Sequence, residues 1–294
     1  MKRSILYQLD AAGATDGARR WDGPDLETLV AEVALAEQLG VDTVWCLPSL
    51  GDQGEFVAEA PEIWLAALAQ RTSRLRLGWG LAGLTAPARP PLREAEKAAS
   101  LDVASEGRLT LGLIPHGPLV DDAEEGAVGE GGTDRVRPDW QEGYRMLVDM
   151  WDRARFSWTS ERFEVRPVDV VPKPVQQPHP PLWLIGWSET HARCAGAGGL
   201  GFFDVSGGLD AVLELHRDAY AAARAACDPL DLVSEHAFAV LTDLDPGAEG
   251  EGRIAELAQL AVDQIVLRLA PLERGHDQAL ERIRFLTEAT ADLH

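Results

Sequence analysis

The chain has 294 residues, of which 46% are hydrophobic and 26% are charged, so it can bury a sizeable core. Its formal net charge of −21 argues against nucleic acid or an anionic membrane as a general partner. Three cysteines without metal-ligand spacing indicate reduced thiols, and the sequence pattern predicts neither a signal peptide nor a long apolar segment. We therefore expect a soluble, cytoplasmic protein.

Hydrophobic periodicity predicts alternating strands and helices along the chain. Short apolar runs between turns predict strands, whereas amphipathic stripes bounded by proline or glycine predict helices. The predicted strands are 4–9, 41–46, 74–80, 108–114, 182–185, 201–205, 236–241 and 264–269. The predicted helices are 25–39, 61–70, 92–104, 140–151, 188–196, 209–227, 251–260 and 278–289.

Two segments interrupt this alternation. Residues 115–138 are rich in Gly, Asp and Glu without periodicity, which predicts a lid loop or a disordered segment. Residues 156–171 read as an excursion that leads into a proline-rich segment.

Eight strand–helix units without an internal linker predict one α/β domain over residues 1–294, a (β/α)8 TIM barrel. An open doubly wound sheet is the alternative, but no glycine-rich dinucleotide motif follows the first strand. A barrel would place an active site on the loops after the strands.

The segment from Pro172 to Gly199 carries the most chemical information. Its buried strand ends at Gly186, and Ser188 then stands as the N-cap of a helix. The N–H groups of a first helical turn lack partners within the helix, and the helix dipole favours negative charge. This junction predicts a phosphate site, with a plain helix cap as the alternative.

Five blocks of the sequence carry a family resemblance: LAEQLGVDTVW (35–45), TSRLRLG (72–78), EAEKAASLD through SEGRLTLG (94–112), VPKPVQ through PPLW (171–183) and VDQIVL (262–267). In these blocks the chain resembles the bacterial luciferase-like family of flavin-dependent monooxygenases. The resemblance implies a two-component enzyme that uses reduced FMN and oxygen on a small organic substrate. It also implies a separate flavin reductase as partner and a homodimer.

The resemblance places the flavin phosphate near Trp187, Ser188 and His191, with Thr190 in the same helical turn. For His191, a side chain that points into solvent is the alternative. Near the third strand, the resemblance places Trp79, Gly80 and Leu81 beside the isoalloxazine ring. For Trp79, ordinary core packing is the alternative.

The chain departs from the family after the second strand, where relatives commonly carry a carboxylate followed by histidine. Here Cys46, Leu47 and Pro48 stand instead. Cys46 could face the flavin, but a buried, inert thiol is the commoner case at such a position. His116, after the fourth strand, is the candidate catalytic group for proton transfer, with an ordinary loop histidine as the alternative.

Two other functions stay open: a deazaflavin-dependent oxidoreductase, and a non-catalytic flavin-binding or partner barrel. The histidine spacing predicts no metal site.

Overall fold

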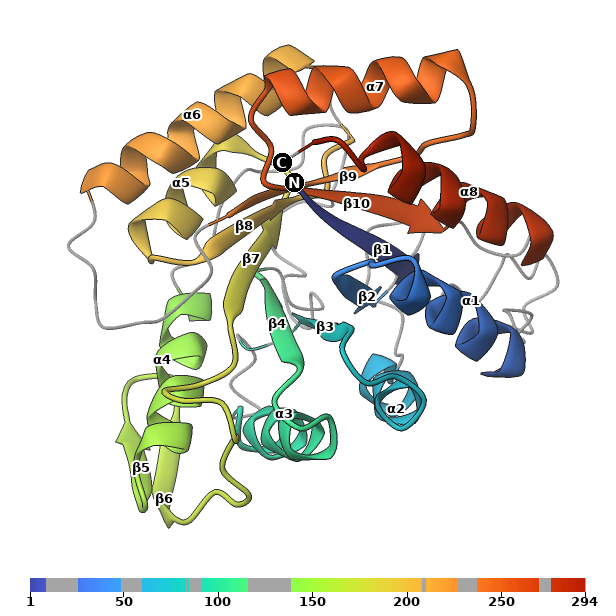
Figure 1. Cartoon of the computed structure of the whole chain (residues 1–294). Helices are drawn as coiled ribbons and strands as arrows, with labels where there is room; N and C mark the ends of the chain where they lie inside the picture. Colours follow the sequence, from blue (N-terminus) through green and yellow to red (C-terminus); the bar gives the residue numbers. More distant parts are fainter. Residues whose placement is uncertain are drawn as a thin grey trace, which may run out of the picture.

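The structure is a computed structural model of the chain. It describes residues 1–8, 26–48, 60–82, 84, 91–115, 139–207, 210–226, 237–269 and 276–293. Within these residues eight parallel strands close into a barrel, and the helices lie around its outside (Figure 1). The predicted (β/α)8 TIM barrel is therefore confirmed as a single domain.

The barrel strands are β1 (Lys2–Gln8), β2 (Thr43–Leu47), β3 (Arg76–Ala82), β4 (Leu109–Ile114), β7 (Leu182–Gly186), β8 (Gly201–Asp204), β9 (Phe238–Thr242) and β10 (Gln264–Leu269). The helices are α1 (Leu26–Gln38), α2 (Pro61–Ala69), α3 (Leu92–Ala104), α4 (Asp139–Asp152), α5 (Glu189–Ala197), α6 (Asp210–Ala226), α7 (Ala248–Gln259) and α8 (His276–Ala289). Around the ring the strands follow the order β1-β10-β9-β8-β7-β4-β3-β2.

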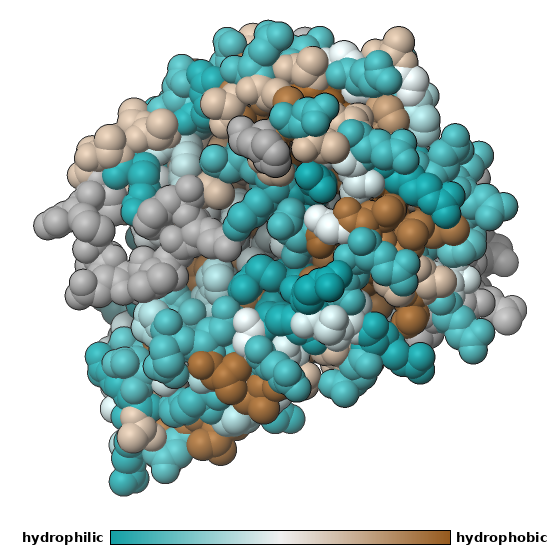
Figure 2. All heavy atoms as spheres, in the orientation of Figure 1, coloured by the Kyte–Doolittle hydropathy of each residue, from teal (hydrophilic) through white to brown (hydrophobic). Residues whose placement is uncertain are grey.

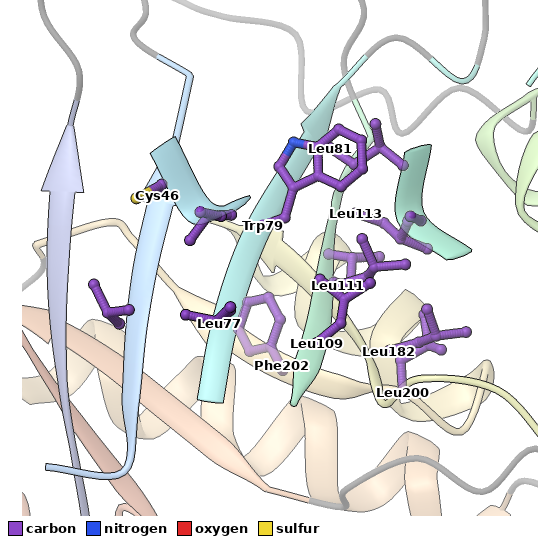
Figure 3. Packing of buried hydrophobic residues seen from close by; sticks show 14 of the residues in the cluster. Cys46, Leu77, Trp79, Leu81, Leu109, Leu111, Leu113, Leu182, Leu200 and Phe202 are labelled. Carbon is purple, nitrogen blue, oxygen red and sulfur yellow. The ribbon is translucent and has the colours of Figure 1, made fainter. Parts of the chain in front are cut away.

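The barrel strands are largely apolar on both faces because one face meets the helices and the other fills the barrel. All five residues of β2 are buried, as are all six of β4. The outer layer includes Leu77, Trp79 and Leu81 of β3, which stand beside the leucines of β4 in Figure 3.

The barrel interior is centred on three aromatic side chains. Trp45 lies edge-on to Trp183 at 6.1 Å between ring centroids and tilts against Phe203 at 5.3 Å. Two glycines make room for this cluster, since a Cβ atom at Gly78 would come within 2.3 Å of the Trp45 ring. At Gly112 a Cβ atom would lie 2.3 Å from Ile185 Cδ1. The interior is thus a packed core.

The excursion after α4 is an antiparallel hairpin of β5 (Phe156–Thr159) and β6 (Glu164–Val168), which lies beside α4 outside the barrel (Figure 1). The proline-rich segment that follows is held by the buried carboxylate of Asp102 on α3. This carboxylate accepts hydrogen bonds from Val175 N at 2.8 Å, Gln176 N at 3.0 Å and Gln176 Nε2 at 2.6 Å. These bonds fix the approach to β7.

Hydrophilic residues cover most of the face in Figure 2, with smaller hydrophobic patches between them. Among the described helices, none combines the length and apolar character that a membrane span requires.

Candidate functional site

In a barrel of this kind the loops after the strands build the active site. His116 and the rest of the predicted lid, 116–138, lie outside the described residues. The described part of this end comprises the strand ends, the junction from β7 to α5, and the turns that follow β8 and β9.

The junction between β7 and α5 is organised by Ser188. This residue has an extended backbone, and its Oγ accepts a hydrogen bond from His191 N at 3.3 Å, so it caps α5 as predicted. The same Oγ lies 2.8 Å from Nδ1 of His191. One hydroxyl therefore holds both the helix start and the orientation of the imidazole.

His191 folds back over the end of β7. A Cβ atom at Gly186 would lie only 2.5 Å from His191 Cβ and 2.7 Å from its Cγ, so only glycine allows this approach. The imidazole is fully buried and packs against the Trp187 ring at 4.8 Å between centroids. Trp187 itself is 38% exposed. Burial excludes the solvent-facing alternative for His191 and favours a role in positioning the turn.

The start of α5 has the electrostatics of an anion site. The backbone N–H groups of its first turn and the helix dipole favour negative charge there. The Glu189 carboxylate, in the same turn, opposes this field, but it forms an ion pair with Arg193 one turn later. Thr190 is half-buried beside it. Contact of these residues with a phosphate stays a prediction.

The three residues predicted beside a flavin ring differ in orientation. Trp79 and Leu81 belong to the outer cluster that packs against the helices, which matches the core-packing alternative for Trp79 (Figure 3). Gly80 faces the interior, where a Cβ atom would meet Leu47 Cδ2 at 2.4 Å. Contact with the flavin ring therefore stays a prediction for Gly80 and for the backbone atoms of Trp79 and Leu81. The Trp79 and Leu81 side chains do not point into the barrel.

Cys46 also lies in the outer cluster and is fully buried. Burial raises the pKa of its thiol to about 12, so the thiol stays neutral near pH 7. The structure thus gives the inert alternative for Cys46.

A buried polar pair lies next to this junction and was not predicted from the sequence. Asp204, which pairs in register with Gly186, places its Oδ2 2.6 Å from His216 Nδ1 on α6. Its other oxygen accepts a hydrogen bond from Ser206 N at 2.8 Å. The pair anchors the turn after β8. No local pattern connects residues twelve positions apart in this way.

Arg268 is a second residue that sequence reasoning missed. It pairs in register with Leu6, a member of the interior cluster, so its side chain lies on the interior side of β10 near the C-terminal end. The available signal was one charged residue in the otherwise apolar end of the run QIVLRL. In the described residues no group of three or more His, Cys, Asp or Glu side chains is placed to hold a metal ion.

A sequence model of the family described as luciferase-like monooxygenase matches residues 1–278. The chain belongs to this family. The resemblance seen in the five sequence blocks is confirmed, and the family match supports the expected enzyme.

Curated relatives of this luciferase-like protein use two kinds of cofactor. It is 25% identical over 268 residues to the F420-dependent glucose-6-phosphate dehydrogenase of Amycolatopsis mediterranei. This alignment covers 87% of this chain and 68% of that protein. It is 29% identical over 159 residues to the oxygenase component of the flavin-dependent trigonelline monooxygenase of Acinetobacter baylyi. This second alignment covers 51% of this chain and 40% of that component. The match thus spans less than half of the trigonelline component.

Similar solved structures also include both flavin-dependent and F420-dependent proteins. The oxygenating constituent of 3,6-diketocamphane monooxygenase of Pseudomonas putida, in complex with FMN, matches with a TM-score of 0.72 and 14% identity over 100% of this chain and 97% of that one. An F420-dependent secondary alcohol dehydrogenase in complex with an F420–acetone adduct matches with a TM-score of 0.70 and 13% identity over 100% and 98%. At sequence identities of 13% and 14%, this structural similarity shows a shared fold alone.

Proposed function

We propose that this luciferase-like enzyme is the oxygenase component of a two-component monooxygenase that uses reduced FMN and oxygen on a small organic substrate. The trigonelline relative, named as an oxygenase component, supports a separate flavin reductase as the partner. The FMN complex of the diketocamphane enzyme supports FMN. The homodimer that the family resemblance implies and the cytoplasmic location expected from the sequence are part of the same proposal.

The observation that carries the proposal is the capped start of α5 after β7. A phosphate there would meet the first-turn N–H groups of Glu189 and Thr190, with the Ser188 cap keeping the turn in place. Half-exposed Trp187 adds an aromatic surface beside it. These groups fit the phosphate end of a flavin nucleotide.

The other end of a flavin is a flat ring system with an apolar dimethylbenzene edge, and the interior cluster offers a surface that matches this edge. Leu47, Ile114, Ile185 and Leu241 carry this cluster to the C-terminal ends of four strands. Their side chains would support the ring and exclude water from it. When bound, reduced flavin supplies the electrons for oxygen activation, and these residues hold and shield it. His116 stays the proposed proton-transfer residue.

The test compares FMN with riboflavin, which lacks the phosphate. Ser188→Ala is expected to weaken FMN binding about tenfold through loss of the cap and its turn, and to leave riboflavin binding unchanged. Ser160→Ala is the matched control, because Ser160 Oγ also accepts hydrogen bonds from backbone N–H groups, of Arg162 and Phe163, in the β5–β6 turn. Equal loss of FMN and riboflavin binding in Ser188→Ala would refute the phosphate assignment.

Oxygen uptake with reduced FMN and a flavin reductase then tests turnover. We expect uptake that depends on the reductase and on added substrate, and that falls strongly in His116→Ala. A protein that binds FMN tightly but shows no uptake with any substrate class would contradict the monooxygenase proposal.

A deazaflavin-dependent oxidoreductase is the second candidate. It is favoured by the F420-dependent relative, whose match covers 87% of this chain. In this case oxygen is not needed, because hydride passes between the substrate and the deazaflavin. Anaerobic bleaching of F420 absorbance in the presence of an alcohol substrate would identify this activity and exclude the oxygenase.

A further inference from the structure

Arg268 lies on the interior side of the barrel, at the end of β10. In the described strands it is the one charged residue on that side at the C-terminal ends, in a chain with a net charge of −21. Its side chain is 33% exposed. Its Nε atom is buried and has no hydrogen-bond partner within the described part of the chain. A buried donor of this kind calls for an acceptor.

Among the described residues, the carboxylate paired with Arg268 does not satisfy this donor. Asp243 Oδ2 lies 3.9 Å from Arg268 Nε, beyond hydrogen-bond distance, and the Asp243 side chain is 54% exposed. Asp243 also lies 3.6 Å from Nη2 of Arg282 on α8. A solvent-exposed, shared carboxylate at this distance contributes little to holding the Arg268 guanidinium.

The backbone beneath Arg268 is nevertheless firmly held. Buried Arg282 donates from Nη1 to the Arg268 carbonyl oxygen at 2.8 Å and from Nε to the Leu244 carbonyl oxygen at 2.6 Å. One guanidinium thus ties the end of β10 to the turn after β9. Arg268 therefore projects from a preorganised position, which lowers the cost of binding an anion.

The neighbours of Arg268 on the interior side are apolar. Leu6 pairs with it in register, and Leu241 lies on the next strand. A guanidinium above an apolar layer suits a molecule with a carboxylate at one end and a hydrocarbon body, since the fork of N–H donors matches a carboxylate.

We propose that Arg268 binds the anionic group of the substrate, so that the substrate class is a small organic acid with an apolar body. The inference rests on the proposed function and adds to it the charge of the substrate. The cofactor phosphate is the competing source of an anion. It is placed at α5 after β7, and β7 and β10 lie three strands apart in a ring of eight, nearly opposite each other.

Benzoate and its neutral analogue benzamide test the proposal by titration calorimetry at low salt, with and without saturating FMN. Wild-type protein is expected to bind benzoate at least about tenfold more tightly than benzamide. Arg268→Met is expected to abolish this preference, and Arg268→Lys to keep part of it. Arg284→Met is the control, because Arg284 is an exposed arginine on α8 whose loss changes the charge equally. Circular dichroism verifies that each variant is folded.

Two results would overturn the proposal. One is equal affinity for benzoate and benzamide in the wild type, or a preference that survives in Arg268→Met. The other is a loss of the FMN-over-riboflavin preference in Arg268→Met, which would assign Arg268 to the cofactor phosphate. The titration without FMN separates this proposal from the proposed function. If the protein binds no flavin, the proposed function is refuted. The preference for benzoate over benzamide still decides the role of Arg268.

Discussion

Gly186 and His191 approach so closely that a Cβ atom at position 186 would lie 2.5 Å from the Cβ atom of His191. The buried imidazole is at the same time held by Ser188 Oγ at 2.8 Å from its Nδ1. The strand end, the cap and the imidazole therefore form one rigid turn at the end of β7.

Gly186→Ala is expected to destabilise the protein by about 1–3 kcal/mol, because the added methyl group must displace the His191 ring from a packed site. FMN affinity should fall with it, since the turn that carries the start of α5 would shift. Urea unfolding and FMN titration measure the two effects.

Gly252→Ala in α7 is the control for this substitution. Nothing lies within 4 Å of a Cβ atom at Gly252, so alanine there should stabilise the helix by about 0.5–1 kcal/mol. If Gly186→Ala and Gly252→Ala had the same free energy of unfolding, close packing at Gly186 would not be the cause of the stability change.

Cys46 makes stability depend on pH in the alkaline range. Burial raises the pKa of its thiol from 9.0 to about 12, so folding favours the neutral form. This contribution is complete below pH 9 and is lost as the pH rises toward 12, with a slope of about 1.4 kcal/mol per pH unit. In Cys46→Ala the slope is expected to be smaller by that amount between pH 9 and 11.

Urea unfolding of wild type and Cys46→Ala at each pH measures this difference. Burial also raises the pKa of Tyr220 to about 12, and this tyrosine is the same in both proteins, so its contribution cancels. The pKa of Tyr7 is raised well above its ordinary value, chiefly by burial and in part by the charge of the nearby Cys46 thiolate, so Tyr7 belongs to the measured difference. A stability difference that stays constant from pH 8 to 11 would show that Cys46 is not the titrating group.

Asp204→Ala is expected to destabilise the protein by about 3–5 kcal/mol, because it leaves His216 without its buried partner and Ser206 N without its acceptor. Asp218→Ala removes an exposed carboxylate paired with the adjacent Arg217, and should cost less than about 1 kcal/mol. Urea unfolding compares the two. Similar losses in both variants would mean that the Asp204–His216 pair contributes no more than a surface ion pair.

Local signals in the sequence were sufficient for the order of strands and helices and for the closed barrel. Proline at position 61 and the Ser188 cap mark helix starts because they act through the backbone of adjacent residues. The excursion after α4 was recognised, but its two short strands became clear only from their pairing.

Only the tertiary structure decided which way each strand residue faces. A strand buried on both sides is apolar throughout, so alternation does not reveal that Trp45 points inward and Trp79 outward. The register with Leu6 shows the side on which Arg268 lies, and the approach of α6 to β8 brings His216 to Asp204. These contacts join residues distant in sequence. They depend on how the ring closes, which no local pattern records.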